Sequence, residues 1–293
     1  MPRTSRHRLS QATTLLLTLA CLAIPAARAH DEPPKTPAEL ADAREQQARL
    51  AAAGVAERRL YESRNGQPET LLLTDTFDAR GRHVAQVVHD PASAQTSRST
   101  YDAAGDWVRE ETWRPDGSSD RVTFAYDAGH LVTAALSEDL ATGTRERLVY
   151  DHAAGADAIV VTKTCADTLV YAIRYDYEPA SGRARLLAAE QTGPRGQLLV
   201  RTRQAWDGGR RRTKEVSARD GTPACAYTYD YDEAGDLRTV VRRNDTGRVV
   251  LTQAYTYAAG RLPSTVTDRD ADGAVTRLLR YEYVLRGAGR AGD

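Results

Sequence analysis

The sequence predicts an all-β protein, an antiparallel meander of about 18 strands with one N-terminal helix. Three observations lead to this fold class. An aromatic-Asp turn motif recurs at intervals of about 25 residues, a second Gly-containing turn lies halfway between successive copies, and the segments between turns alternate apolar and polar residues. We expect the strands to be built as two-strand repeats over residues 55–285.

The recurring motif is an aromatic residue followed by Asp and then Gly, as in "YDEAGDL" at 231–237. Asp accepts hydrogen bonds from its own turn, and Gly supplies a positive φ. The successive intervals between the aromatics are 24, 25, 24, 25, 31, 25, 26 and 26 residues. The aligned aromatics are Phe77, Tyr101, Tyr126, Tyr150, Tyr175, Trp206, Tyr231, Tyr257 and Tyr283, and the acids assigned to turns are Asp78, Asp102, Asp127, Asp151, Asp176, Asp207 and Asp232.

Each unit holds a second turn signal, such as "RNGQ", "RPDGS" or "NDTGR". Two turns per unit leave two strands of about eight residues, joined as an uninterrupted meander. In 274–283, Val275, Leu279, Tyr281 and Tyr283 alternate with polar residues, which indicates one apolar face. Because the helix is too small to cover this face, we expect the sheet to be curled or spiralled on its apolar face, or to dimerise through it.

The first 54 residues divide into a targeting signal and a tether with a helix. Residues 1–29 have a basic start, a short apolar run and a small-residue cleavage site, which predicts a signal peptide cleaved after Ala29 and a periplasmic or secreted protein. Cys21 raises a lipoprotein alternative, although the residues before it match a lipobox poorly. Residues 30–54 are a proline-rich tether and a short helix opened by a Thr36 cap, and residues 286–293 are a flexible tail.

Net charge limits the class of binding partner, and the cysteine positions predict whether a disulfide forms. Residues 1–29 hold four Arg and no acid, so the mature chain carries 36 basic and 40 acidic residues, which disfavours a nucleic-acid partner. No later apolar run is long enough for a membrane span. Cys165 and Cys225 fall four or five strands apart, about 20 Å in a flat sheet, so we expect two free thiols.

The repeat Tyr-Asp-x-x-Gly resembles the YD repeat of the RHS family, over roughly residues 55–285. The copies are degenerate, since Ala258 replaces Asp and the copy at 126–129 is one residue short. The resemblance implies a long sheet wound into a spiral shell, which encloses a C-terminal toxin in large family members. This chain is a short array that ends after its last repeat, without a toxin domain, so the toxin function is not carried over. The signal segment and the repeat look bacterial.

Two metal hypotheses arise from the sequence. Asp268, Asp270 and Asp272 before Gly273 have the spacing of a Ca²⁺ loop, while an ordinary acidic hairpin turn explains the same residues. Cleavage after Ala29 would expose His30 as an N-terminal copper ligand. The remaining histidines, which include His89, show no spacing typical of metal ligands. Three of them are interpreted as solvated turn residues: His83, His130 and His152.

Tyrosines paired on one face of a strand are the candidate binding residues. They fill the interior of the curl or form a platform for sugar rings or a protein. The residues are Tyr175, Tyr177, Tyr227, Tyr229, Tyr255 and Tyr281.

We found no catalytic motif, and we therefore expect a non-catalytic secreted or periplasmic binding or structural module, with a protein or an envelope glycan as its ligand. The alternatives are an immunity-type neutraliser of an envelope-acting toxin, an outer-membrane β-barrel, and a metal-dependent enzyme.

Overall fold

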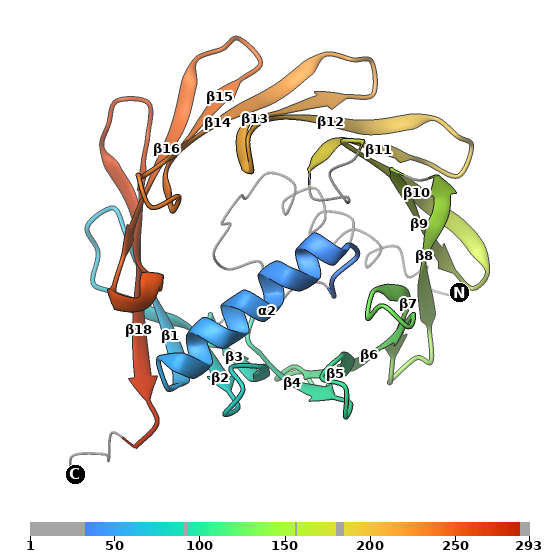
Figure 1. The fold of residues 1–293 in the computed structure, drawn as a ribbon, viewed down its shortest axis with the longest axis horizontal. Coiled ribbons are helices and arrows are strands. Elements are labelled where there is room, and N and C mark those ends of the chain that lie inside the picture. The colour runs from blue at the N-terminus through green and yellow to red at the C-terminus, as the bar shows by residue number, and fades with distance from the viewer. Residues whose placement is uncertain (1–32, 91–92, 156, 180–184, 288–293) are drawn as a thin grey trace, which may run out of the picture. The chain divides into compact units, whose positions relative to one another are not determined.

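A computed structural model describes residues 33–90, 93–155, 157–179 and 185–287, and the predictions for residues 1–29, His30 and the end of the tail lie outside this part. In these ranges, one α-helix and 18 strands follow one another (Figure 1). They are α2 (Pro37–Ala52), β1 (Val55–Arg64), β2 (Thr70–Phe77), β3 (His83–Val88), β4 (Gln95–Tyr101), β5 (Trp107–Trp113), β6 (Ser119–Tyr126), β7 (Val132–Asp139), β8 (Arg145–Gly155), β9 (Ala158–Cys165), β10 (Thr168–Tyr177), β11 (Leu186–Thr192), β12 (Leu198–Asp207), β13 (Arg210–Ala218), β14 (Pro223–Tyr231), β15 (Leu237–Asn244), β16 (Val249–Tyr257), the 3₁₀ turn η2 (Ala259–Arg261), β17 (Pro263–Arg269) and β18 (Val275–Leu285).

The strands form a closed ring, so the sheet curls on its apolar face as expected and also closes, which the sequence did not predict. Each strand pairs antiparallel with the next, and β18 pairs back onto β1 from Val55 opposite Leu285 to Arg64 opposite Arg277. A meander with two free edges exposes two rows of unpaired backbone groups. Closure pairs both rows, and this long-range contact carries no local sequence signal.

The helix begins and ends where its caps predict. Thr36 Oγ1 accepts from the Glu39 backbone N–H at 3.1 Å, and Pro37 occupies the first turn. Glu39 Oε2 in turn accepts from the Lys35 N–H at 2.7 Å, one residue earlier than in a strict capping box. Gly54, at φ +65°, takes the left-handed conformation that ends the helix.

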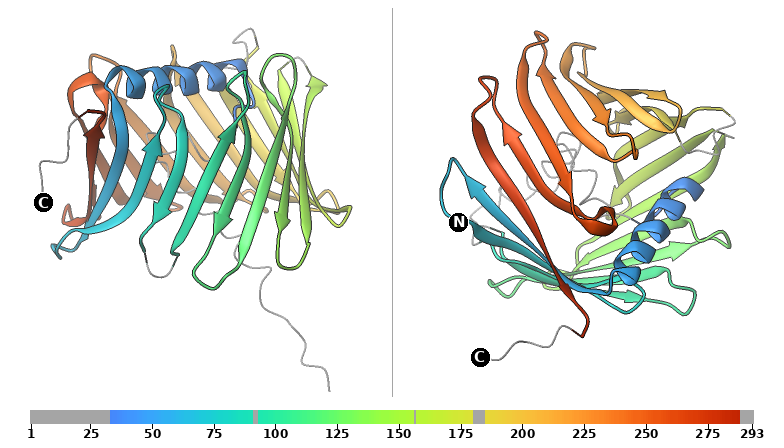
Figure 2. Two further views of the ribbon diagram at one scale, coloured as in Figure 1. Left: turned by 90° about the horizontal axis from the view of Figure 1, so that it is seen from below. Right: turned by 60° about the vertical axis from the view of Figure 1, so that its left-hand side comes forward.

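The helix lies across one end of the ring, inside its outline (Figures 1 and 2). At one side the Val132 N–H donates to the Pro34 carbonyl at 3.0 Å. At the other side, Leu50 packs against Val55, Phe77 and Leu262. The β2–β3 turn passes so close to the helix that a Cβ on Gly81 would lie 2.0 Å from the Gln47 carbonyl oxygen, so only glycine fits there. The weak helix therefore covers the ring's end rather than the sheet's apolar face.

The contacts with the helix identify the inner face of the ring. Phe77 packs against Leu50, so its face of β2 is the inner one. Following the cross-strand register from there places Tyr227, Tyr255 and Tyr281 on the same face, and all three are buried. A second buried cluster on this face joins β7–β10 around Ile159. The apolar face therefore lines the interior, as the alternation predicted.

A repeated hydrogen bond explains why an aromatic residue precedes each Asp-containing turn of the repeat. In most units, the Tyr hydroxyl or the Trp indole N–H donates to a backbone carbonyl 18 to 20 residues earlier in the chain. That carbonyl lies at the start of the preceding strand. These bonds brace one hairpin against its neighbour. They are Tyr101 to His83 O (2.9 Å), Tyr126 to Trp107 O (2.6 Å), Trp206 to Leu186 O (2.8 Å), Tyr231 to Arg211 O (3.0 Å), Tyr257 to Leu237 O (2.9 Å) and Tyr283 to Pro263 O (2.8 Å).

Three units depart from this pattern in an understandable way. In the unit aligned on Tyr150, the imidazole of His152 donates to Val132 O at 2.7 Å. Phe77 lacks a hydroxyl and packs against the helix instead. The alignment on Tyr175 was wrong, because β10 continues to Tyr177 and Asp176 lies within the strand, bonded to Arg174.

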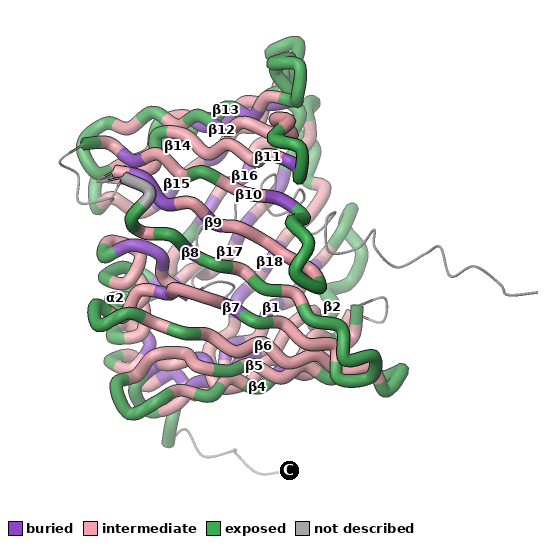
Figure 3. Tube along the Cα trace, turned by 90° about the vertical axis from the view of Figure 1, so that its right-hand side faces the viewer, coloured by how far each residue is buried: buried purple, intermediate pink, exposed green. Residues whose placement is uncertain are grey.

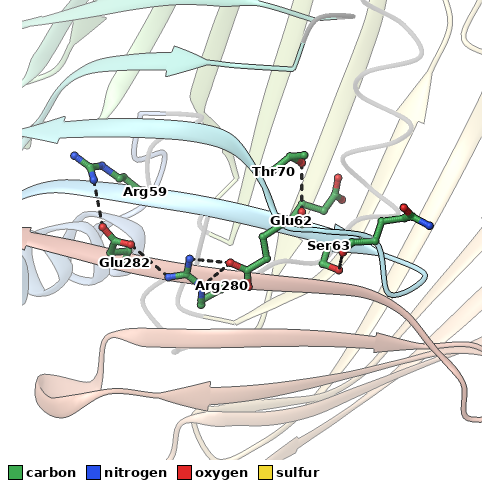
Figure 4. Close-up of polar contacts among 8 residues, drawn as sticks. Arg59, Glu62, Ser63, Thr70, Arg280 and Glu282 are labelled. Atoms are coloured by element: carbon green, nitrogen blue, oxygen red, sulfur yellow. Dashed lines mark hydrogen bonds and ion pairs between the residues drawn. The ribbon is translucent and has the colours of Figure 1, made fainter.

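The outer face of the ring carries many charged side chains, with exposed apolar residues such as Trp113, Leu136 and Val149 between them. Arg59 pairs with Glu282 at 3.3 Å, and Arg280 bridges Glu282 and Glu69 (Figure 4). Cross-strand pairs of this kind recur around the ring, as in Arg201–Glu190 at 2.6 Å. Figure 3 shows the walls as mostly half-buried or exposed, with exposed turns at both ends. The outward positions are thus suited to contact with water.

Cys165 and Cys225 are not joined in a disulfide, as predicted. Cys165 ends β9, and Cys225 is buried on β14, five strands further round the ring.

Candidate binding surface inside the ring

The six candidate tyrosines all lie on the inner face. Tyr227 and Tyr229 on β14 and Tyr255 on β16 are each less than 7 % exposed, and Val240 on β15 separates Tyr229 from β16. Tyr281 on β18 continues this wall, while Tyr175 and Tyr177 lie on β10 in the other buried cluster. The rings therefore form two groups on the inner wall, and the binding role of both stays a prediction.

The most enclosed polar group is an ion pair between β1 and β2. Asp75, 1 % exposed, accepts from Arg58 Nε at 2.8 Å and Nη2 at 2.6 Å. Its other oxygen receives His83 Nε2 at 3.1 Å and Gln86 Nε2 at 3.0 Å. Burial on its own would raise the pKa of Asp75, but the hydrogen bond from His83 and the charge of Arg58 outweigh it and lower that pKa well below its usual value. Asp75 is therefore held as a carboxylate.

His83 corrects a prediction, because it is buried rather than a solvated turn residue. A β-bulge at the start of β3 pairs Phe77 with His83 but Thr76 with Ala85, which leaves Val84 as the extra residue. The bulge reverses the alternation and turns His83 to the inner face. Strict period-two reasoning misses such residues. His130, which pairs with Asp106 at 2.8 Å, lies at a turn as predicted, whereas His152 lies within β8.

The acidic triplet at the last hairpin is not gathered into one group. Asp268 points inward from β17 and binds Arg277 at 2.7 Å and Gln253 at 3.0 Å. Asp270 instead holds its own turn, accepting from the backbone N–H groups of Asp272 and Ala274. This geometry favours the acidic-turn interpretation. Within the described ranges, no group of three His, Cys, Asp or Glu side chains is placed to hold a metal ion.

Comparisons with known proteins add little. No family model matches the chain, and no curated protein matches it. Among solved structures, a porin-like protein from Bacteroides uniformis matches with 10 % identity and a TM-score of 0.33 over 78 % of this chain and 98 % of that one. The Pseudomonas aeruginosa MucA/MucB complex gives 15 % identity and a TM-score of 0.14 over 82 % and 92 %. Scores this low do not show a shared fold, so function is argued from this chain's residues.

No helix in the described part of the chain has the length and apolar character needed to cross a membrane.

Inner-wall cations lie over aromatic rings on both sides of the ring. On the β1–β3 side, Arg58, which pairs with Asp75, lies 5.7 Å from the Phe77 ring centroid. On the β13–β15 side, Arg211 Cζ is 4.1 Å from the Tyr229 ring centroid, and Lys214 Nζ is 5.6 Å from that of Tyr227. Cation–π contacts therefore stabilise both parts of the wall.

Proposed function

We propose that the mature chain is a water-exposed β-barrel of the bacterial cell envelope that binds a ligand on its inner face and is not an enzyme. The observation that carries the proposal is the sidedness of the ring, with tyrosines inside and ion pairs outside. The diameter of a barrel grows with strand number, and rings of 16 to 18 strands are too wide for their own side chains to fill. A ring of this width has an interior that the described strand side chains do not fill, and we place the ligand there.

Outward side chains near the middle of the strands support contact with water. They include the arginine and glutamate residues Arg109, Glu111, Arg147, Arg174, Arg201, Arg203 and Glu215. A membrane barrel needs an apolar outer band about 25 Å tall, and each Arg or Lys at its midplane costs about 2–4 kcal/mol. Seven such charges at mid-strand positions would oppose insertion in lipid.

An outer-membrane β-barrel is the second candidate. Its support is the closed ring with an even number of antiparallel strands, an architecture that this class requires and that an open repeat array lacks. The two candidates differ in what the outer face contacts, which a fractionation experiment can decide.

The test is expression of the full chain with its signal segment in a bacterial host, followed by separate recovery of periplasm and outer membrane. We expect release by osmotic shock, a monodisperse protein without detergent, and no heat-modifiable migration on a gel. Recovery only in detergent with heat-modifiable migration would overturn the water-exposed proposal and support the membrane candidate.

The released protein, immobilised, then serves as bait for envelope proteins and isolated cell-wall material. Retention of glycan would favour the tyrosine wall as the binding surface, and stoichiometric recovery of one protein would favour the neutraliser alternative. Retention of neither would count against a binding module.

A further inference from the structure

A buried acceptor and a buried donor lie on neighbouring strands of the inner wall, and neither atom makes a hydrogen bond within the described chain. The acceptor is Oε1 of Glu62 on β1, and the donor is the hydroxyl of Tyr281 on β18. The two residues are 6 % and 7 % exposed. In the cross-strand register Glu62 stands opposite Leu279, two residues from Tyr281 on the same face. The two side chains are therefore diagonal neighbours, within reach of one ligand group.

The rest of each side chain is held in place by its surroundings. Glu62 Oε2 pairs with Arg64 Nε at 2.9 Å, while Oε1 is 3.9 Å from Arg277 Nη1, which is too far for a hydrogen bond. The guanidinium of Arg58 lies 5.9 Å from the centroid of the Tyr281 ring. Burial raises the pKa of Tyr281 above its usual value, so the hydroxyl keeps its proton and is a donor at neutral pH.

The tyrosines at the turns show what a satisfied hydroxyl looks like in this ring. The hydroxyls of Tyr231, Tyr257 and Tyr283 each donate to a backbone carbonyl of the preceding hairpin. Tyr281 lies two residues from Tyr283 on the same strand, yet its hydroxyl has no such acceptor. A buried polar atom without a partner is costly. A molecule that donates to Glu62 and accepts from Tyr281 would satisfy both atoms at once.

The charges on this part of the wall are balanced, which selects the kind of ligand. A carboxylate or phosphate has no proton to donate to Glu62, and an ammonium group cannot accept from Tyr281. A neutral hydroxyl does both, because its proton goes to the carboxylate while its oxygen accepts from the phenol. The three charged pairs on this wall are Arg58–Asp75 (2.6 Å), Arg64–Glu62 (2.9 Å) and Arg277–Asp268 (2.7 Å).

A ligand reaches these atoms from the end of the ring opposite α2. The helix leads into the start of β1 and lies along that end of the strands only, whereas Glu62 is two residues from the other end of β1 (Figure 2). Arg64, the last residue of β1, stands between Glu62 and this mouth, and its side chain is 69 % exposed. Exposed side chains change rotamer within nanoseconds, so Arg64 does not bar the way.

We propose that Glu62 and Tyr281 bind a neutral sugar that enters the ring. One sugar hydroxyl donates to Glu62 Oε1 and accepts from the Tyr281 hydroxyl. The proposal names the ligand class for the proposed function and rests on it, because it requires a ligand inside the ring.

The test titrates the mature protein by calorimetry with two neutral oligosaccharides, tetra-N-acetylchitotetraose and maltotetraose. Permethylated maltotetraose is the matched probe, since its ether oxygens accept hydrogen bonds but donate none. We expect at least one sugar to bind, the permethylated form to bind at least tenfold more weakly, and added salt to change the affinity little. No binding of either sugar at concentrations up to about 10 mM, or equal binding of the permethylated form, would overturn the proposal.

The variants Tyr281→Phe and Tyr257→Phe separate binding from folding. Y281F removes a hydroxyl that has no acceptor in the described chain, so it should weaken sugar binding by about two- to tenfold and leave the unfolding temperature of the free protein unchanged. Y257F removes the 2.9 Å bond to Leu237 O, so it should lower the unfolding temperature by about 2–4 °C and leave binding unchanged. The reverse pattern would contradict the assignment.

Glu62→Gln and Glu282→Gln form a second matched pair. Glu282, on the neighbouring strand β18, faces outward and pairs with Arg59 and Arg280 (Figure 4). Hydrogen bonds to a charged group are stronger than those between neutral groups, so E62Q should weaken sugar binding by about tenfold or more. E282Q should change it by less than about twofold. The sugar should raise the unfolding temperature of the wild-type protein and of E282Q far more than that of E62Q.

The outcomes distinguish this site from the proposed function. Sugar binding that is unchanged in both Y281F and E62Q would mean that the two atoms hold an ordered water only, which refutes the site. A released, folded barrel that still retains glycan or protein would in that case leave the proposed function standing. A chain recovered only in outer membranes would instead refute the proposed function.

Discussion

The substitution Asp75→Asn tests the role assigned to the buried ion pair. Asp75 and Arg58 are 1 % and 5 % exposed, and the carboxylate receives four hydrogen bonds, two of them from the guanidinium. Asparagine keeps the shape but removes the charge, and its NH₂ group faces another donor. Removing one partner of a buried pair leaves the other charge uncompensated, which costs about 3–5 kcal/mol. We expect D75N to lower the free energy of unfolding by this amount.

The measurement is urea unfolding of mature wild-type and variant proteins, followed by circular dichroism. Asp176→Asn is the matched control, because Asp176 pairs with Arg174 at 2.8 Å on the exposed outer face, where a salt bridge contributes about 0–1 kcal/mol. The double variant R58M/D75N should recover part of the loss, since no unpaired buried charge remains. A D75N effect no larger than that of D176N would refute the claim that the pair organises the β1–β2 wall.

The same pair predicts a pH dependence. The pKa of Asp75 is lower in the folded than in the unfolded protein, so its contribution to stability is present above the unfolded value, about 3.9, and is lost as the pH falls toward the folded value. The difference in unfolding free energy between wild type and D75N should therefore be constant at neutral pH and shrink below about pH 4. A difference that stays constant under acid would contradict the linkage.

Three further predictions concern the brace, the helix and the thiols. Tyr257→Phe removes the 2.9 Å bond to Leu237 O and should cost about 0.5–1.5 kcal/mol in urea unfolding; because burial raises the pKa of Tyr257 to about 12, its contribution should be lost between pH 10 and about 12 in wild type but not in the variant. Leu50→Ala should cost about 2–5 kcal/mol locally, seen as faster hydrogen exchange in α2 than in the strands; equal acceleration everywhere would contradict independent docking of the helix. Iodoacetamide should label half-buried Cys165 before buried Cys225, and a disulfide in mass spectra would contradict the ring.

The sequence predicts most of the fold because its signals are local. Turn residues, the Thr36 cap and period-two alternation each act within a few positions, and they specify 18 strands, one helix and the face that is buried. Closure is a different kind of contact. It joins β1 to β18 through residues some 220 positions apart, such as Arg59 and Glu282, and nothing in either strand marks the other as its partner. The alternatives of a spiral and a dimer were open for this reason.

The candidate site was predicted less completely, and the bulges show why. Alternation places the tyrosines correctly, because their strands keep one phase from turn to turn. His83 and Arg211 follow a bulge at which the phase reverses, so their inward position depends on one extra residue that leaves no trace in the apolar pattern. The turn motif itself was an observable signal, because the β-bulge follows the same aromatic-Asp turn in both units. Applying one phase reversal after each such turn would have placed both residues inside.

The hydrogen bonds from turn aromatics to backbone carbonyls connect the repeat to the proposed function. Because the tyrosine hydroxyls at the turns bind backbone carbonyls, the ring is held together at its edge by side chains that reach only the neighbouring hairpin. The central part of the inner wall is not needed for that purpose. Inner-wall tyrosines there, such as Tyr227 and Tyr255, are buried although they take no part in these turn bonds. Because the ring is held at its edge without them, they are the surface on which we place the proposed ligand.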